Sequence, residues 1–137
     1  MSMFSIIDVG RTGVGFSRYW MDVIAHNLTN VNTITPAGEE PFRARMVAAQ
    51  ALGSEPFAPA GSGVAVSRVQ LDAGEPGQVY DPAHPFANEA GNVTLPVVDM
   101  GGQMTDLIIA NRSYQLNLKT VETGREAYQA ALRLGSR

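Results

Sequence analysis

The amino-acid sequence predicts a mainly α-helical protein with a small β-rich insert between two long terminal helices. All eight prolines lie between residues 36 and 96, and neither flank contains one. Because proline lacks a backbone donor and breaks helices, only the two flanks can form long helices. Apolar residues recur there at steps of three and four, which is helical periodicity. We therefore divide the chain into an N-terminal helix in residues 1–35, a β-rich insert in 36–100 and a C-terminal helix in 101–137.

The N-terminal flank carries two neighbouring stripes of apolar and small residues. The first stripe consists of Ile6, Val9, Gly13, Phe16, Trp20, Val23 and Asn27. The second consists of Ile7, Val14, Met21, Ile24 and Leu28. Two stripes predict contact with more than one partner, and we expect other subunits to be those partners because the chain is small. Glycines 10, 13 and 15 each weaken an isolated helix by about 0.8–1 kcal/mol relative to alanine, and they permit close approach of another backbone.

A run of asparagine and threonine residues follows the second stripe, with the sequence NLTNVNT in residues 27–33. One such residue is enough to satisfy the last carbonyls of a helix, whereas this run contains five polar side chains. Amide side chains supply both donors and acceptors. Two interpretations stay open: an ordinary capped helix end, or a hydrogen-bonded packing site between subunits that includes Asn27, Leu28, Asn30 and Asn32.

The insert predicts short strands separated by turn residues. The expected strands are Phe42 to Gln50, Val64 to Leu71, Gln78 to Tyr80 and Asn92 to Leu95. In the second strand Val64 and Val66 alternate, but Val69 and Leu71 resume one residue out of phase, which predicts a β-bulge. The insert carries eight acids and three bases, while the C-terminal flank carries three acids and five bases. This imbalance favours contact between unlike parts of neighbouring subunits.

The C-terminal flank predicts one helix of roughly 30 residues, which would span on the order of 45 Å, too long for a compact domain of this size. Asp99 is the expected N-cap and Gly135 the expected stop. The flank carries a heptad-like seam that consists of Met104, Leu107, Asn111, Tyr114, Leu118, Val121, Arg125, Tyr128 and Leu132. The polar residues Asn111 and Arg125 would specify the register or the partners of this seam.

Composition argues against several classes of protein. The net charge of −3 argues against a nucleic-acid partner, because such proteins normally carry a basic patch. The chain has no cysteine, so it has neither disulfides nor a thiolate metal site. We expect no transmembrane segment, because no apolar run approaches the roughly 20 residues that a bilayer requires. We expect no cleavable signal peptide either, because Asp8 and Arg11 interrupt the N-terminal apolar residues.

The sequence also lacks a recognisable catalytic or metal-binding constellation. The two histidines, His26 and His84, lie on different segments. Asp81 and His84 offer two ligands without a third at metal-site spacing, so a proline-rich turn is the favoured interpretation. Residues 10–15 contain three glycines but lack the lysine of a phosphate-binding loop. We therefore predict no enzyme, no metal and no cofactor.

Three segments carry a resemblance to the axial proteins of the bacterial flagellum. Residues 25–33, AHNLTNVNT, resemble the N-terminal signature of flagellar rod and hook proteins, which usually reads close to ANNLANxNT. Residues 110–114, ANRSY, are similar to the C-terminal signature ASRxY of the same proteins. Residues 79–87 resemble a short rod subunit in particular, and the signature residues are Tyr80, Asp81, Pro82, His84 and Pro85.

The resemblance implies that the terminal helices pair into an elongated, coiled-coil-like domain that lines a tube, with the insert outside it. It implies a structural subunit of the proximal rod of the flagellar basal body, which polymerises with other rod subunits and copies of itself into a torque-transmitting drive shaft. It further implies export into the periplasmic rod by the flagellar type III apparatus without signal cleavage. The alternatives are another rod or hook axial subunit, or a helical adaptor of a type III secretion system.

Overall fold

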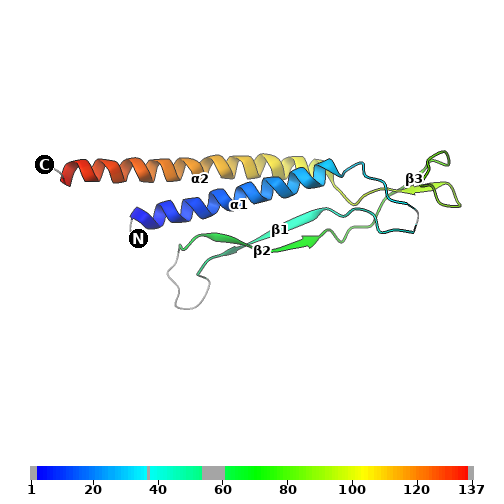
Figure 1. Cartoon of the computed structure of the whole chain (residues 1–137), viewed down its shortest axis with the longest axis horizontal. Coiled ribbons are helices and arrows are strands. Elements are labelled where there is room, and N and C mark those ends of the chain that lie inside the picture. Colours follow the sequence, from blue (N-terminus) through cyan, green and yellow to red (C-terminus); the bar gives the residue numbers. More distant parts are fainter. Residues whose placement is uncertain (1–2, 37, 54–60, 136–137) are drawn as a thin grey trace.

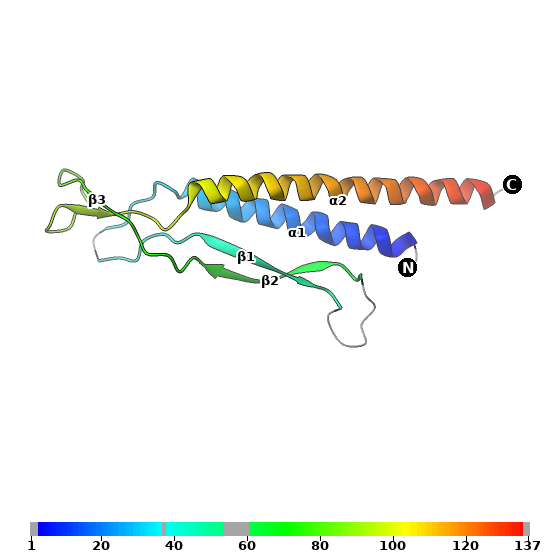
Figure 2. The same cartoon turned by 180° about the vertical axis from the view of Figure 1, so that it is seen from behind.

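The computed structural model describes residues 3–36, 38–53 and 61–135, which form an elongated molecule of two helices and two small sheets (Figure 1). The elements are α1 (Met3–Thr29), β1 (Arg45–Ala51), β2 (Val64–Leu71), β3 (Gln78–Tyr80), β4 (Asn92–Thr94) and α2 (Met100–Gly135). The helices lie side by side, with the start of α1 and the end of α2 at the same end of the molecule (Figures 1 and 2). The predicted mainly helical fold with a β-rich insert is confirmed.

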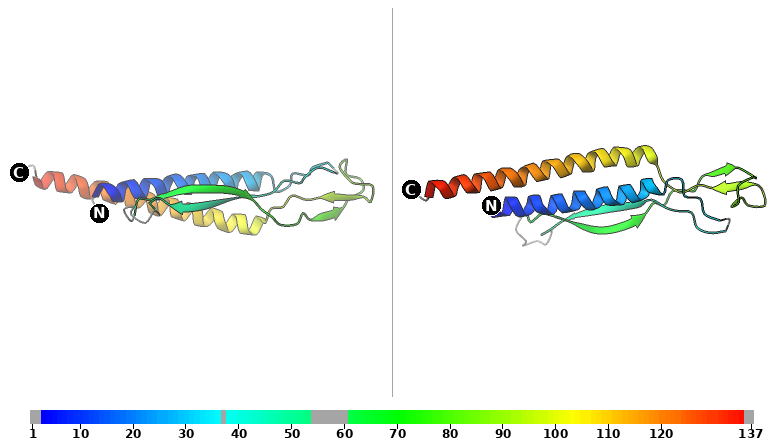
Figure 3. Two further views of the ribbon diagram at one scale, coloured as in Figure 1. Left: turned by 90° about the horizontal axis from the view of Figure 1, so that it is seen from below. Right: turned by 45° about the horizontal axis from the view of Figure 1, so that its top comes forward.

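Helix α1 lies between α2 and the β1–β2 hairpin (Figure 3). On the hairpin side, the backbone N–H of Val64 donates to Thr12 Oγ1 over 3.0 Å, and this hydroxyl donates to the carbonyl of Val9. On the other side, the backbone at Gly10 lies against Val121 of α2. Helix α1 therefore contacts two partners within the chain, α2 and the hairpin. Contact of its stripes with other subunits stays a prediction.

The β1–β2 hairpin contains the predicted bulge. Antiparallel pairing runs from Arg45 opposite Leu71 to Ala48 opposite Arg68, and then resumes with Ala49 opposite Val66. Ser67 is therefore the extra residue, at the point where the valine alternation changes phase.

The first strand begins three residues later than predicted. The backbone N–H of Ala44 donates to the carbonyl of Val97 over 2.9 Å, and Arg43 forms an isolated parallel bridge with Val97. These residues therefore pair with the segment that leads into α2, while the carbonyl of Ala44 still accepts from the N–H of Asp72 just after β2. Ala44 and Val97 are both buried, so this junction belongs to the core of the molecule.

Strands β3 and β4 form a separate antiparallel pair at the end of the molecule away from the start of α1 (Figure 1). The pair ends at Thr94 instead of Leu95, whose N–H donates to the carbonyl of Gly77 outside the strands. The connecting loop is a series of turns, in which the N–H of His84 donates to the carbonyl of Asp81 and the N–H of Ala83 to its carboxylate. The interpretation of this segment as a proline-rich turn is confirmed.

Helix α2 has 36 residues and is therefore longer than predicted. Its N-cap is Asp99, whose Oδ1 accepts from the N–H of Gly101 over 3.1 Å and whose carbonyl accepts from the N–H of Gln103 over 2.9 Å. It ends at Gly135, as expected. The C-terminal part of α2 projects past the first turn of α1 (Figure 1). In the described ranges, neither helix has the length and apolar character needed to cross a membrane.

Candidate assembly surface

The two helices approach each other through small residues. A β-carbon placed on Gly10 would lie 2.7 Å from Val121 Cγ2, and one on Gly13 would lie 2.6 Å from the Asn117 side chain. In the opposite direction, a β-carbon on Gly124 of α2 would lie 3.0 Å from Ile7. Any of these contacts is too short for a larger residue without a shift of its neighbour. The predicted close approach of another backbone is confirmed at Gly10, where such a β-carbon would lie 3.5 Å from the Asn117 carbonyl oxygen. At Gly13 the close neighbour is the Asn117 side chain, and Gly15 faces open space.

This packing splits the predicted seam of α2 into two rows. The row of Leu107, Tyr114, Val121 and Tyr128 is half-buried. The row of Met104, Asn111, Leu118, Arg125 and Leu132 is exposed. Its place beside α1 is taken by Gln103, Ala110, Asn117 and Gly124, which also repeat at seven residues and are all buried or half-buried. Sequence reasoning favoured the larger side chains of the seam. In the structure Gly13 of α1 faces Asn117 and Gly124 of α2 faces Ile7, so a glycine of one helix receives a larger side chain of the other.

Asn27 ties three elements together with one completely buried side chain, of which 0% is exposed. Its Nδ2 donates to the carbonyl of Arg45 at the start of β1 over 2.8 Å and to Gln103 Oε1 on α2 over 2.7 Å. Its Oδ1 accepts from the N–H of Arg45 over 2.8 Å. Both donors and one acceptor are therefore used within the chain, which differs from the interpretation of Asn27 as part of a packing site between subunits.

The rest of the asparagine and threonine run caps α1. Thr29 Oγ1 donates to the carbonyl of Ala25 over 2.7 Å, and Asn30 Nδ2 donates to the carbonyl of His26 over 2.8 Å. Thr33 Oγ1 donates to Asn30 Oδ1 over 3.2 Å. These bonds match the first interpretation of the run, a capped helix end. Asn32 is exposed and Leu28 is half-buried.

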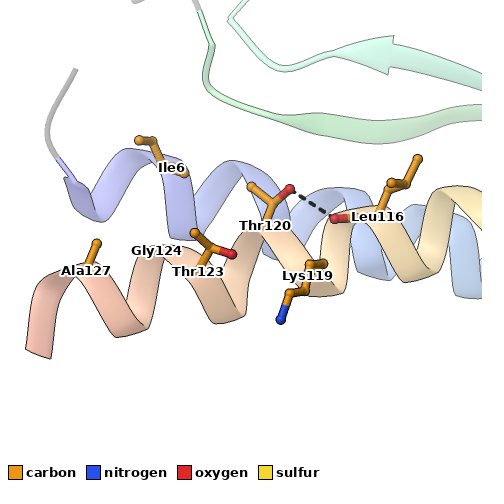
Figure 4. Close-up of a pocket in the computed structure, with 7 residues that line it drawn as sticks. All are labelled: Ile6, Leu116, Lys119, Thr120, Thr123, Gly124 and Ala127. Carbon is orange, nitrogen blue, oxygen red and sulfur yellow. Dashed lines mark hydrogen bonds between the residues drawn. The ribbon is translucent and has the colours of Figure 1, made fainter.

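One side of α2 carries an open groove, which we call the groove (Figure 4). Its volume is about 430 Å³, and it is lined by Ile6, Leu116, Lys119, Thr120, Thr123, Gly124 and Ala127. Among these lining residues, Leu116 has 70% of its surface exposed. The Thr120 hydroxyl donates to the carbonyl of Leu116 over 2.9 Å, so it is satisfied within the helix and adds little polarity to the groove.

The other side of α2 carries larger apolar residues, Met104, Ile108 and Leu118, which we call the ridge. Their exposed fractions are 55%, 57% and 40%, respectively. At about 100° per residue, the ridge and the groove lie on opposite sides of the line along which α2 faces α1. Exposed large apolar residues on both sides of one helix exceed what a monomer in solution usually presents.

The total surface supports the same conclusion. The chain exposes 9446 Å². A compact folded monomer of 14.6 kDa would expose about 6,900 Å² by the usual scaling with mass. The excess of roughly 2,500 Å² is comparable in size to the total area buried in an obligate interface. The elongated shape therefore leaves enough exposed surface for contacts of that size with neighbouring molecules.

The signature residues of the insert lie far from the helical surface. Tyr80 ends β3 with 71% of its surface exposed, and Asp81, Pro82, His84 and Pro85 form the adjoining turns. Gly91 closes the same loop with a φ of +77°, which glycine adopts without strain, and its Cα packs against the Tyr80 ring. In the described part of the chain, no three histidine or carboxylate side chains gather as a metal site would require.

Comparison with known proteins places the chain in a family. Residues 90–134 match a family described as "Flagellar basal body rod FlgEFG protein C-terminal". The flagellar basal-body rod protein FlgC of Yersinia enterocolitica is 31% identical over 98% of this chain and 99% of its own length. FlgC of Borreliella burgdorferi is 33% identical over 96% and 97%, and FlgC of Bacillus subtilis is 33% identical over 98% and 99%. The chain therefore belongs to the FlgC family of flagellar basal-body rod proteins.

Proposed function

We propose that this chain is a structural subunit of the rod that polymerises through the outer faces of its α1–α2 pair. The observation that carries the proposal is the pair of exposed apolar surfaces on α2, the ridge and the groove. Helix α1 has partners on two sides within the chain, so α2 offers the larger unoccupied apolar surface. Coiled-coil-like contacts between helices of neighbouring subunits would cover it. Neighbours in the tube would be copies of this chain and other rod subunits.

A subunit of a drive shaft must transmit torque between its insert and its helices, so the connection between these parts must be rigid. Two sets of bonds connect the β1–β2 hairpin to the helices here. Asn27 holds the start of β1 and also bonds to Gln103 of α2, and Thr12 holds the start of β2. Within the insert, Arg43 Nη1 donates to the carbonyls of Asp72 and Gly74 over 2.9 and 2.7 Å. A load on the hairpin would therefore reach α1 near both ends of the hairpin, and α2 through Asn27.

The proposal includes export without cleavage at the N-terminus. The first turns of α1 contact α2, since Ile7 lies against Gly124 and Gly10 against Val121. Removal of a leader from this end would delete those contacts. The chain recovered from rods should therefore retain residues 3–29 in full.

The test is recovery of the chain in isolated basal bodies. Cells that lack the native gene would express the chain, Leu116→Ser, or Leu71→Ser, an exposed apolar control on β2. Quantitative mass spectrometry of stripped basal bodies should find the chain and the control at a fixed small ratio to other rod proteins. Leu116→Ser should lower that ratio and swimming speed several-fold, because it removes apolar area beside the groove.

Two outcomes would contradict the proposal. Absence of the unsubstituted chain from otherwise complete rods would remove the structural role, and a soluble complex of a few subunits would favour the adaptor alternative. Full recovery of Leu116→Ser would place the polymerising surface elsewhere. The same spectra test the export claim, because peptides from residues 3–11 would be missing from a cleaved chain.

A further inference from the structure

The two exposed sides of α2 differ in shape as well as in position. The groove side presents small residues, Thr123, Gly124 and Ala127, between Ile6 and Leu116. The ridge side presents three larger side chains that project from the helix. Side chains of one helix pack into the depressions of another when large residues face small ones. The ridge and the groove are therefore complementary, and both belong to the same chain.

We infer that the ridge of one copy occupies the groove of a second copy, with the two α2 helices side by side and pointing in the same direction. The inference rests on the proposed rod function and names the contact through which that function operates. Leu118 stands at the same height along α2 as the groove, which extends from Leu116 to Ala127. With little axial displacement between copies, Leu118 is the ridge residue that enters it.

Charge agrees with this arrangement. Lys119 is the charged residue among those that line the groove. Glu122 lies one turn after Leu118 on the ridge side, and in the isolated chain it accepts from Lys119 over 3.4 Å. Both side chains remain largely exposed, at 69% and 53%, so each can take a further partner. Between copies at equal height, Glu122 of the ridge copy is three residues, about 4.5 Å along the axis, from Lys119 of the groove copy, a separation that these long side chains can span. Such a pair adds little affinity but favours one register.

The groove also continues an interface that already exists. Gly124 forms part of the groove and at the same time contacts Ile7 of α1. A second α2 helix would therefore pack in the trough between α1 and α2 of its neighbour. Because the ridge and the groove are different surfaces, the contact is heterologous and leaves a free ridge at one edge and a free groove at the other. Such a contact repeats around a tube and does not close as a dimer.

Cysteine cross-linking tests the contact cleanly, because the chain contains no cysteine of its own. Cells without the native gene would co-express Leu118→Cys and Thr120→Cys chains, and their basal bodies would be isolated and mildly oxidised. At equal height these positions differ by two residues, about 3 Å along the axis, which a disulfide can span. Mass spectrometry of unreduced peptides should find a disulfide between positions 118 and 120, and neither variant alone should give a dimer. Met104→Cys and Ile108→Cys, each with Thr120→Cys, cover copies that are displaced along the axis.

A matched control uses Thr123→Cys with Thr120→Cys, because both positions line the groove and neither lies on the ridge, so chains at equal height should give no disulfide. Failure of all three ridge cysteines to reach position 120, in rods that contain both chains, would overturn the inference. A symmetric link between two Thr120→Cys chains would also overturn it. A photo-cross-linker at position 120 that captures a different rod protein would overturn self-association while leaving the rod function intact. Absence of the unsubstituted chain from basal bodies would overturn both.

Discussion

At the residue scale, Asn27 connects α1, β1 and α2 through one buried side chain. Asn27→Leu would leave the N–H and carbonyl of Arg45 without their partner and remove a bond from Gln103. Each buried group left unsatisfied costs about 1–3 kcal/mol, so we expect the free energy of unfolding to fall by roughly 2–4 kcal/mol. Urea denaturation followed by circular dichroism would measure the loss.

The control for this prediction is Asn30→Ala at the exposed end of the same helix. The Asn30 side chain donates to the carbonyl of His26 and accepts from Thr33, and water can replace both of these exposed bonds. Its loss should cost about 0.5–1 kcal/mol. Equal effects of the two substitutions would show that Asn27 is a simple cap and that the connection between elements does not depend on it.

At the element scale, glycines of α1 differ in what surrounds them. Gly15→Ala meets nothing within 4 Å, so it should raise the free energy of unfolding by about 0.4–1 kcal/mol through helix propensity alone. Gly10→Ala gains the same propensity but forces a β-carbon against Val121 Cγ2, at 2.7 Å, with the Asn117 carbonyl behind it. Overpacking costs about 1–3 kcal/mol, so Gly10→Ala should be the less stable variant. Thermal unfolding of both variants would measure the difference in stability between them. If Gly10→Ala were more stable than the unsubstituted chain, close contact between the helices at Gly10 would be excluded.

The elements themselves could be predicted from local patterns. Proline placement separated helices from strands, Asp99 and Gly135 set the ends of α2, and the valine phase in β2 placed its bulge. Each of these signals acts within a few residues of the structure it determines. The connecting contacts act over longer distances: Asn27 bonds to Gln103, 76 residues away. No local pattern reveals such a partner, which is why the asparagine run had two open interpretations.

The assembly surface was predicted in part for the same reason. Heptad spacing identified α2 and its apolar character, but it could not decide which row faces α1. The decisive signal was the seven-residue spacing of Gln103, Ala110, Asn117 and Gly124, which apolar patterning overlooks because these residues are small or polar. The larger residues of the exposed row do not face α1, and their contact with other subunits stays a prediction.

At the scale of the whole molecule, the rest of the chain buries α2 unevenly along its length. Residues 103–110 lie beside α1 and the Asn27 cluster, and Ala110 is fully buried. Residues 129–135 are exposed without exception. An unpacked end of a helix frays in water, because each terminal residue is held only by a propagation step whose free energy is close to zero. The free chain should therefore be well ordered in residues 103–110 and weakly ordered in residues 129–135.

Hydrogen exchange would test this difference in order. In the isolated chain, peptides from residues 129–135 should exchange almost as fast as an unfolded peptide, with opening free energies near zero. Peptides from residues 103–110 should be protected by a large part of the global stability. Incorporation into rods should protect the terminal segment, because neighbours would then cover it. Slow exchange throughout residues 129–135 before assembly would mean that α2 is stable by itself, and the order of its end would then not depend on rod formation.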